Sequence, residues 1–478
     1  MLFNSLQYLI FLPLVFAIYW GMNHRSLKLQ NLLLLAASYY FYACWDWRFL
    51  FLLVFSTGLD YYTGLKMKDA PSVRMKKFWF WLSIGINVGF LGIFKYYNFF
   101  AESFADLLSN FGFQANFWTL QVILPVGISF YTFHGLSYVI DIYKNRIEPE
   151  RNIVDYSLFV SYFPLLVAGP IERATHLLPQ IKKKRIFNSD KAIDGLHQII
   201  WGLFKKIVIA DSCATYANQI FDNYENANSL TLLLGALYFT FQIYGDFSGY
   251  SDIALGTSKL FGIDLLRNFN YPYFSRDIAE FWRRWHISLS SWFKDYLYIP
   301  LGGSQGGTLM KVRNTFIIFL VSGFWHGANW TFIVWGLLNA VYFMPLLLSN
   351  TNRYHIDIVA KGKKWPTVKE FFSMSLTFCL AMFAWIFFRA ETVAMAIQYI
   401  KNIFLFNFKG GVAYLSIDRY SIELVGLLGI FIVFEWVSRE KEHPFFGRFL
   451  YIRLVLVLLG LLLFGAFTNA ADFIYFQF

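Results

Sequence analysis

The stretch LVSGFWHGANW occupies residues 320–330 and lies inside a longer segment, Asn314–Asn352, that contains no Asp, Glu, Lys or Arg. This segment has 39 residues, whereas one membrane-crossing helix needs about 20. It therefore predicts two crossings, joined by a tight turn near His326–Asn329. The turn carries one ionisable ring, that of His326, among aromatic residues and glycines. Because such a ring is costly in a dry environment, His326 needs either a structural partner or a function.

The rest of the chain is equally apolar. Of its 478 residues, 57% are hydrophobic, 21% aromatic and 15% charged, and the mean hydropathy is +0.46. A soluble domain is nearer one quarter charged, so the composition predicts an all-α polytopic membrane protein. The net charge of +11 comes from short basic clusters between apolar segments, a pattern that indicates membrane topology and not nucleic-acid binding.

The apolar segments predict about 11 crossings and some membrane-dipping or interfacial helices. The clear candidates are Leu6–Met22, Leu29–Trp45, Phe78–Phe94, Leu120–Ile140, Ser229–Tyr244, Phe371–Phe388 and Leu454–Ala471. Three weaker candidates are Phe49–Leu65, Gly195–Ala210 and Leu424–Trp436. The segment Tyr156–Ile171 contains two prolines and a glycine, which predicts a re-entrant or broken helix. The first 23 residues are expected to form a spanning helix and not a cleavable signal peptide, because no basic region precedes them.

The loops predict orientation and domain organisation. Lys66–Lys77, Lys182–Arg185 and Lys361–Lys364 are rich in Lys and Arg, so the positive-inside rule places them in the cytoplasm and both termini outside it. No internal repeat or second soluble domain is apparent, and residues 1–478 are expected to form one domain. Cys44, Cys213 and Cys379 lack metal-type spacing, so neither a metal nor a permanently bound cofactor is expected.

The segment Asp277–Tyr298 predicts an amphipathic helix capped by Asp277. At 100° per residue its apolar stripe is Ile278, Phe281, Trp282, Trp285, Leu289, Trp292 and Tyr296. The opposite face carries Glu280, Arg283, Arg284, Ser291, Lys294 and Asp295. We expect this helix to lie along the cytoplasmic interface, with its tryptophans in lipid and its arginines in water. His286 is near the edge of the apolar face, either as an incidental residue of an anchor or as a functional group.

Two other groups of polar residues have open interpretations. Asp246, Ser248, Ser251 and Asp252 lie in YGDFSGYSDIALGTSKLFG (Tyr244–Gly262), where they would cap a broken helix or contact a substrate. His326 would be either a buried neutral histidine donating to a carbonyl or a general base. As a base, its neutral ring would take a proton from a hydroxyl that attacks a thioester.

Several motifs in a fixed order carry a resemblance to a family. They are DFSGYSD (Asp246–Asp252), FWRRWHISLSSWF (Phe281–Phe293), YIPLGG (Tyr298–Gly303) and SGFWHGANWTFIVWG (Ser322–Gly336). Together they resemble the membrane-bound O-acyltransferase superfamily, in its bacterial branch typified by the membrane subunit of alginate O-acetylation. LPVGISFYTFHGLSYVIDIY, FPLLVAGPIER and AWIFFRA (Ala384–Ala390) extend the match over essentially the whole chain, with a catalytic core at about residues 120–350.

The resemblance implies a helical bundle whose thinned centre is crossed by a tunnel. It implies two catalytic positions, which correspond to His286 and to the near-invariant histidine, His326. We expect His326 to be the base and His286 to position the donor. The residues expected to line the tunnel or contact substrate are Asp246, Ser248, Ser251, Asp252, Trp285, Trp325, Asn329 and His134. His134 departs from the family pattern, which has a neutral residue at that position.

The resemblance also implies a reaction. An acetyl group would come from cytoplasmic acetyl-coenzyme A, cross the bacterial inner membrane and reach an extracytoplasmic polysaccharide through a separate SGNH-hydrolase-like acetyltransferase. The donor's phosphates would meet a positive cytoplasmic mouth, made by Arg267, Arg276, Arg283, Arg284 and Arg313. The polysaccharide, a covalent acetyl-histidine and the oligomeric state are left open.

Two alternatives stay in view. One is D-alanyl transfer to teichoic acid from a carrier-protein thioester, although the closeness of SGFWHGANWTF and AWIFFRA to the acetylation branch favours acetyl transfer. The other is a proton-coupled transporter, since intramembrane histidines and acids also serve as proton relays. Transporters often carry two-fold internal repeats, and none is found here.

Overall fold

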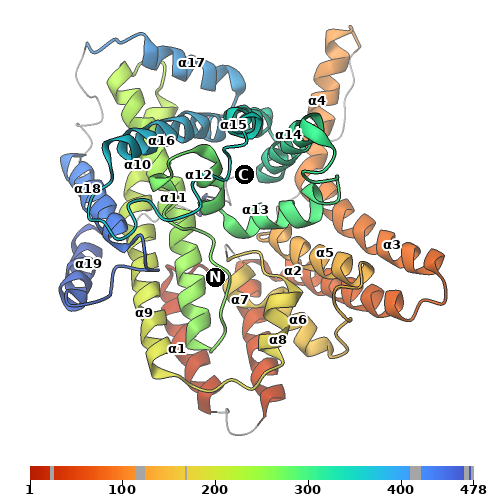
Figure 1. Cartoon of the computed structure of the whole chain (residues 1–478). Helices are drawn as coiled ribbons and strands as arrows, with labels where there is room; N and C mark the ends of the chain where they lie inside the picture. Colours follow the sequence, from red (N-terminus) through yellow and green to blue (C-terminus); the bar gives the residue numbers. More distant parts are fainter. Residues whose placement is uncertain (22–25, 114–123, 167–168, 410–420, 468–472, 475–478) are drawn as a thin grey trace. The chain divides into compact units, whose positions relative to one another are not determined.

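The structure, a computed structural model, describes residues 1–21, 26–113, 124–166, 169–409, 421–467 and 473–474, and all regular structure in this part is helical (Figure 1). The predicted all-α class is therefore confirmed. The chain packs as two units: an N-terminal unit, Met1–Gly195 with Ala254–Leu266, and a C-terminal unit, Leu196–Ile253 with Arg267–Phe478. The single domain expected over residues 1–478 stays a prediction. The beginning of the predicted span Leu120–Ile140 and the end of Leu454–Ala471 lie outside the described residues.

The N-terminal unit contains the first helices of the chain. They are α1 (Leu6–Gly21), α2 (Leu27–Lys68), α3 (Val73–Leu91), the π-helix η1 (Gly92–Tyr96), α4 (Tyr97–Asn110), α5 (Ile128–Tyr143), α6 (Ile153–Ser161), α7 (Phe163–Leu166) and α8 (Ala174–Ile181). Two predicted spans form the single helix α2, which bends at Asp46, where φ is −157° and ψ is 109°. The break between α6 and α7 confirms the broken helix predicted at Tyr156–Ile171.

The C-terminal unit contains the elements that hold the candidate site. They are the π-helix η2 (Phe204–Ala210), α10 (Asp211–Asp222), the 3₁₀ turn η3 (Pro272–Phe274), α12 (Ile278–Arg284), α13 (Ile287–Phe293), the π-helix η4 (Lys294–Tyr298), α14 (Gly307–His326), α15 (Trp330–Leu348), α16 (Val368–Arg389), α17 (Val393–Phe404), α18 (Ser421–Ser438) and α19 (Leu450–Phe464). Two further helices, α9 (Ser189–Leu203) and α11 (Ser229–Leu260), run from one unit into the other.

Four described helices are long and apolar enough to cross a membrane: Val73–Asn110, Ser229–Leu260, Trp330–Leu348 and Val368–Arg389. Shorter apolar helices are Leu6–Gly21, Leu424–Ser438 and Leu450–Phe464. The protein therefore has the helices of a multi-pass membrane protein, whereas the number of about 11 crossings stays a prediction.

The uncharged segment folds as predicted, into α14 and α15 with a turn at residues 327–329. The two helices lie side by side (Figure 1) and approach each other through glycines. A Cβ on Gly323 would lie 2.2 Å from the carbonyl oxygen of Phe332, and a Cβ on Gly336 would lie 2.3 Å from that of Phe319. Only glycine permits this backbone approach, which fixes the end of α14 where His326 lies.

We predict that Gly323→Ala destabilises the protein by at least about 1–3 kcal/mol, because the added methyl group must push two helix backbones apart. The midpoint of thermal unfolding in detergent measures this. The matched control is Gly426→Ala on α18, where a Cβ would meet no atom within 4 Å. Equal midpoints for the two variants would contradict the close packing of α14 against α15.

The prediction of one amphipathic interfacial helix over Asp277–Tyr298 is wrong. Asp277 does cap α12, with its side chain accepting from Glu280 N–H, but α12 ends before His286 and α13 begins after it. Trp285, Leu289 and Trp292 of the supposed lipid face are buried in protein, and so are Glu280 and Arg284 of the supposed water face. Two short helices, whose predicted lipid face is packed in protein, replace one long helix.

The broken helix considered at Tyr244–Gly262 is not observed either. Helix α11 continues through Asp246, Ser248, Ser251 and Asp252 to Leu260. It packs closely on η2 and the end of α9, since a Cβ on Gly249 would lie 2.7 Å from the carbonyl oxygen of Gly202. These four polar side chains are therefore not helix caps, and the partners of Asp246, Ser251 and Asp252 lie on other elements.

Candidate active site

His286 lies at the break between α12 and α13. Its backbone is in the left-handed region, with φ 43° and ψ 55°, which is uncommon for a residue other than glycine. A neighbouring extended segment fixes this conformation: Asn270 N–H donates to Arg284 O at 2.9 Å, and Ile287 N–H donates to Asn268 O at 2.8 Å. Such an outlier, when the surrounding structure fixes it, is a common feature of functional sites.

The side chain of Asn268 ties this break to α11. It is fully buried, donates from Nδ2 to Ser251 Oγ at 3.1 Å, and accepts from Ser288 Oγ at 2.5 Å. Asn268 thus joins α11 and α13 through both its backbone and its side chain. Sequence analysis missed it because it lies in a loop without a recognisable motif.

The imidazole of His286 is 1% exposed and is surrounded by aromatic rings. The ring of Phe247, on α11, lies 4.6 Å away edge-on, and that of Trp325 lies 6.1 Å away. Among the described residues, neither ring nitrogen of His286 has a hydrogen-bond partner. A buried polar group without a protein partner is costly, which makes the His286 ring a candidate for contact with a substrate.

His326 is the last residue of α14 and is also buried. Its ring contacts Trp325 at 4.9 Å, Trp335 at 5.1 Å and Phe388 at 5.3 Å between centroids. The ring of Trp325 therefore contacts both histidines. Trp335 and Phe388 come from α15 and α16, so three helices build the aromatic surroundings of His326.

A cavity of about 250 Å³ lies between α12, α13, η4, α14 and α15. We name it the α14 cavity; Trp282, Phe319 and Ser322 line it, as do the exposed cations Lys294 and Arg353. Phe319, Ser322 and His326 follow each other at spacings of three and four residues, so they share one face of α14. The cavity thus runs along the helix face that ends at His326.

The carboxylates of Asp246 and Asp252 are paired with two buried lysines of η2. Lys206 Nζ lies 2.7 Å from Asp211 Oδ1 and 2.9 Å from Asp246 Oδ1. Lys205 Nζ lies 2.9 Å from Asp252 Oδ2 and 3.4 Å from a carboxylate oxygen of Glu435, on α18. We call these six residues the buried ion cluster. It holds η2 and α18 against α11, whose Phe247 contacts His286.

The buried ion cluster also reaches the described C-terminal residues. Ile474 N–H donates to Asp246 Oδ2 at 2.6 Å, and the ring of Phe473 lies 4.4 Å from that of Tyr250. Asp246 and Asp252 therefore support the site through packing and ion pairs, and Lys205, Lys206 and Glu435 are residues that sequence analysis missed. Two lysines in an apolar span were a signal, because a buried cation requires a buried acid.

The arginines of the predicted positive mouth have different surroundings. Arg276 and Arg284 are buried and both pair with Glu280, at 3.0 and 2.8 Å. Arg276 also pairs with Asp357 and Glu370, so acids in the protein compensate the charges of both arginines, and their role at the mouth stays a prediction. Arg283 and Arg313 are exposed, although their guanidinium groups donate to backbone carbonyls at 2.6–3.1 Å.

The other predicted tunnel residues also separate into groups. Trp285 belongs to the aromatic surroundings, stacked on Phe281 at 5.5 Å. Ser248 and Ser251 are buried on α11. Asn329 is the N-cap of α15: its side chain accepts from Thr331 N–H at 3.0 Å and donates to Glu391 O at 2.9 Å. Asn329 thus shapes the turn after His326.

His134 belongs to the N-terminal unit and has backbone partners. It is buried on α5, its Nε2 accepts from Glu172 N–H at 3.0 Å, and its Nδ1 lies 3.5 Å from Val160 O. A neutral ring with the proton on Nδ1 satisfies both contacts. His134 therefore has the contacts of a structural histidine, which explains how the chain accommodates this departure from the family pattern.

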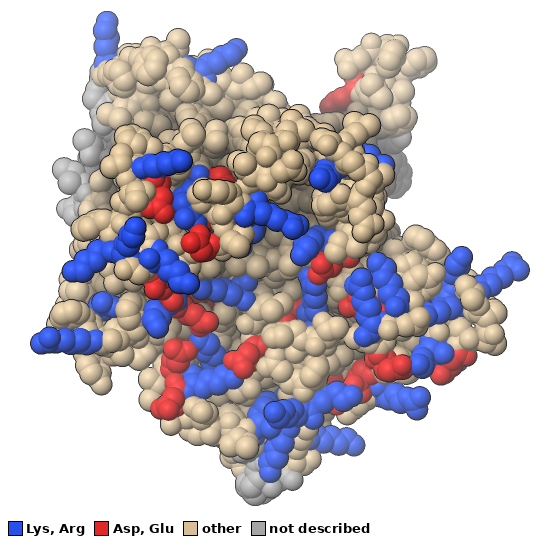
Figure 2. Space-filling view, viewed as in Figure 1, with Lys and Arg blue, Asp and Glu red and all other residues tan. Residues whose placement is uncertain are grey.

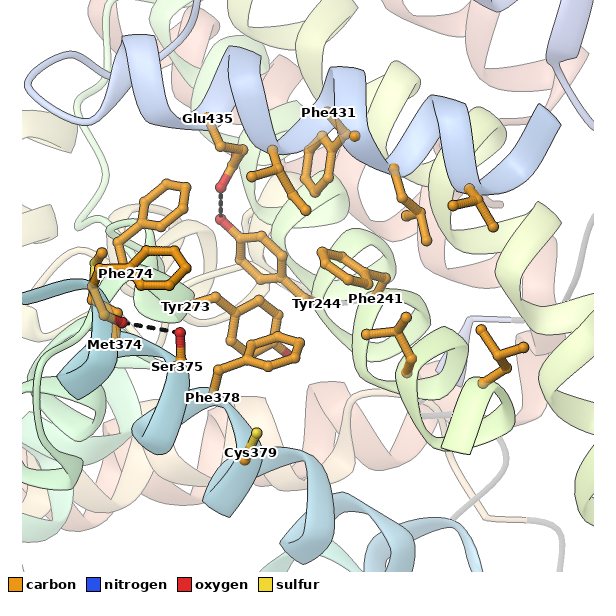
Figure 3. A pocket seen from close by; sticks show the side chains of 17 residues that line it. Phe241, Tyr244, Tyr273, Phe274, Met374, Ser375, Phe378, Cys379, Phe431 and Glu435 are labelled. Atoms are coloured by element: carbon orange, nitrogen blue, oxygen red, sulfur yellow. Dashed lines mark hydrogen bonds between the residues drawn. The ribbon is translucent and has the colours of Figure 1, made fainter. Parts of the chain in front are cut away.

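A second cavity, of about 520 Å³, lies between α11, α16 and α18 (Figure 3). Phe241, Tyr273 and Phe378 line it, and the Tyr244 hydroxyl donates to Glu435 Oε2 at 2.6 Å. Tyr244 and Tyr273 also pack against Trp285, at 6.0 and 5.9 Å between ring centroids. The walls of this second cavity suit hydrocarbon and not a sugar, so it is a poor route for a carbohydrate acceptor.

Within the described residues, no cluster of three His, Cys, Asp or Glu side chains could hold a metal ion.

We predict that His286→Gln lowers the rate of acyl transfer about ten- to hundredfold. This is the effect on rate of losing one hydrogen bond to a group that is charged or becomes charged in the transition state. His286→Ala should lower it further, because it also removes the ring packed on Phe247. Product formation per amount of folded protein is the measurement, with Ser291→Ala, on α13 but outside the lining of the α14 cavity, as control. Full activity of His286→Ala would contradict a role for this side chain in the site.

The helical scaffold and a match to a protein-family model define the class of protein. The chain belongs to the membrane-bound O-acyltransferase family, which it matches over residues 146–388. This range includes His286, His326, the buried ion cluster except Glu435, and the α14 cavity. The protein is thus a multi-pass membrane acyltransferase, and the transporter alternative is left without support.

Particular relatives narrow the class. The chain is 40% identical over 410 residues to the probable alginate O-acetylase AlgI of Pseudomonas aeruginosa, covering 85% of this chain and 75% of that protein. It is 36% identical over 434 residues to the peptidoglycan O-acetyltransferase of Helicobacter pylori, covering 84% and 80%. The teichoic acid D-alanyltransferase of Bacillus subtilis is 30% identical over 230 residues, covering 46% of this chain and 58% of that protein.

Proposed function

We propose that this protein takes an acetyl group from acetyl-coenzyme A on the cytoplasmic side of the bacterial inner membrane and passes it across for O-acetylation of an extracytoplasmic polysaccharide. The observation that carries the proposal is that the buried rings of His286 and His326 both contact Trp325, at 6.1 and 4.9 Å between centroids, and that the face of α14 that lines the α14 cavity ends at His326. The identity of about 40% over 85% of the chain to proteins named as alginate O-acetylases supports acetyl as the transferred group.

The α14 cavity is the proposed site of the donor's thioester arm. Lys294 and Arg353 line it and are exposed, so they can attract the phosphates of coenzyme A. The buried wall, with Trp282 and Phe319, suits the uncharged arm that carries the thioester. In this proposal Lys294 and Arg353 replace Arg276 and Arg284, whose charges Glu280, Asp357 and Glu370 compensate.

The proposed chemistry is transfer of an acyl group to an acceptor hydroxyl. His326 takes the hydroxyl proton as the oxygen attacks the thioester carbonyl carbon; the C–O bond forms, the C–S bond breaks, and the proton passes to the thiolate that leaves. His286, buried and without a hydrogen-bond partner in the described part of the chain, donates to the carbonyl oxygen as negative charge develops there. The aromatic side chains exclude water, which would otherwise hydrolyse the thioester.

A separate protein is needed to finish the reaction in this proposal. We infer that an SGNH-hydrolase-like acetyltransferase accepts the acetyl group outside the membrane and esterifies the polysaccharide. D-alanyl transfer to teichoic acid is the second candidate, but the relatives with that name match less than half of this chain.

The test is reconstitution of the purified protein in liposomes with radiolabelled acetyl-coenzyme A or with a D-alanyl carrier-protein thioester. We expect release of coenzyme A that depends on His326 and on an acceptor hydroxyl on the opposite side of the membrane. Turnover of only the D-alanyl thioester would overturn the assignment of acetyl. In cells, deletion of the gene should lower the O-acetyl ester content of a surface polysaccharide.

A further inference from the structure

The N-terminal unit holds a second built site, around the basic cluster that sequence analysis used only for topology. A cavity of about 550 Å³ lies between α8 and the loop after α11. His176, Lys183, Lys184 and Arg185 line it, together with Asp264 from that loop. We name it the α8 cavity. The face of the molecule drawn in Figure 2 carries more basic than acidic side chains, so positive surface charge alone does not distinguish the α8 cavity from the rest of that face.

The charges that face the α8 cavity are mostly uncompensated. Arg185 is buried, yet its guanidinium donates to neutral acceptors, the Asn31 side chain and Ile181 O. Lys183 and Lys184 are exposed, and no ion pair joins either of them to a described carboxylate. Asp264, the acid in the cavity wall, pairs with Lys191 at 2.7 Å. Three positive charges therefore remain for an anion.

His176 completes the cavity wall through a fully buried carboxylate. Glu172 is 0% exposed, and its carboxylate accepts from Leu266 N–H at 2.6 Å and contacts His176 Nδ1 at 2.7 Å. The hydrogen bond to Glu172 raises the pKa of His176 above its usual range. Since Nδ1 is used by Glu172, the ring's other nitrogen, as an N–H, is the group left for a ligand.

We propose that the α8 cavity binds a phosphate group, carried by an anionic lipid headgroup or by a nucleotide. Lysine ammonium groups and a protonated imidazole are suitable donors for phosphate oxygens. Ile186, which also lines the cavity, and its neighbour Phe187 are exposed apolar side chains; beside a basic cluster they suit a lipid surface. This site lies outside the proposed acyl-transfer machinery and does not depend on the proposed function.

The experiment uses the full-length protein in detergent, titrated separately with phosphatidylglycerol and with coenzyme A and followed by native mass spectrometry. Lys183→Ala/Lys184→Ala should weaken binding of the recognised probe about thirtyfold. The matched control, Lys361→Ala/Lys363→Ala, removes the same charge from another basic loop and should bind like wild type. Lys183→Arg/Lys184→Arg should also retain binding, which separates charge from folding defects.

The two probes distinguish the sources of the phosphate. Weaker binding of phosphatidylglycerol supports a lipid headgroup, and weaker binding of coenzyme A supports a nucleotide. Unchanged binding of both probes, or equal weakening by the control variant, would overturn the proposal. Wild-type affinity should fall as the pH rises through the raised pKa of His176, because the cationic form is lost; His176→Gln should show no such fall. A pH-independent wild type would overturn the assignment of His176.

Discussion

His326→Ala should lower acetyl transfer about 10²–10⁴-fold, the usual contribution of a general base, while the protein still folds and reaches the membrane. His326→Gln should fail equally, because an amide can form a hydrogen bond but cannot accept the proton. The measurement is coenzyme A release by the reconstituted protein, together with polymer ester content in a deletion strain that carries each variant. Protein amount is checked by immunoblot.

The control for this prediction is His355→Gln, which makes the same change in the loop between α15 and α16, away from the aromatic surroundings of His326. It should leave the rate unchanged. Substantial transfer by His326→Gln would remove the base assignment. The buried ring would then be a packing residue between Trp325, Trp335 and Phe388, the structural interpretation that the sequence left open.

Lys206→Met should destabilise the protein by about 3–5 kcal/mol, since it leaves the buried carboxylates of Asp211 and Asp246 without their shared cation. The side chains of Lys206 and Asp246 are 1% and 3% exposed. The midpoint of thermal unfolding in detergent measures the loss. Lys206→Met combined with Asp211→Asn and Asp246→Asn should recover part of it, because the amides carry no charge.

The matched control is Lys68→Met, which breaks the Lys68–Glu148 pair, 2.7 Å long, whose side chains are 50% and 74% exposed. An exposed pair contributes at most about 1 kcal/mol. Similar midpoints for Lys206→Met and Lys68→Met would mean that water reaches the buried ion cluster, and the proposed support of α11 by η2 would have to be abandoned.

Much of the scaffold could be predicted from local sequence. The absence of charge over Asn314–Asn352 predicted α14, the turn and α15, because hydrophobic length and a turn of small residues are local properties. The two histidines could also be predicted, from motif resemblance and from the cost of an ionisable ring in an apolar segment. For His326, the aromatic neighbours Trp325 and Trp335 were visible within the same motif.

The helical periodicity of the apolar residues gave a wrong prediction at His286. The segment Asp277–Tyr298 has a helical pattern throughout, and nothing local in it predicts a left-handed residue. The break depends on backbone hydrogen bonds with Asn268 and Asn270, which lie 18 and 16 residues before His286 and bind the two ends of the interruption. An apolar stripe predicted a lipid face, whereas Trp285, Leu289 and Trp292 of that stripe are buried in protein.

The sequence by itself determined the helical membrane scaffold and the pair of helices α14 and α15, since hydropathy and turn chemistry act over a few residues. It also singled out His286 and His326 as candidates, whose roles stay predictions. Only the tertiary structure decided which charged side chains are free to meet a substrate. Arg276 pairs with Asp357, 81 residues away, and Tyr244 donates to Glu435, 191 residues away. Coulomb energy depends on distance in space and on burial, so a charge that looks available in the sequence is compensated when the fold places an acid beside it.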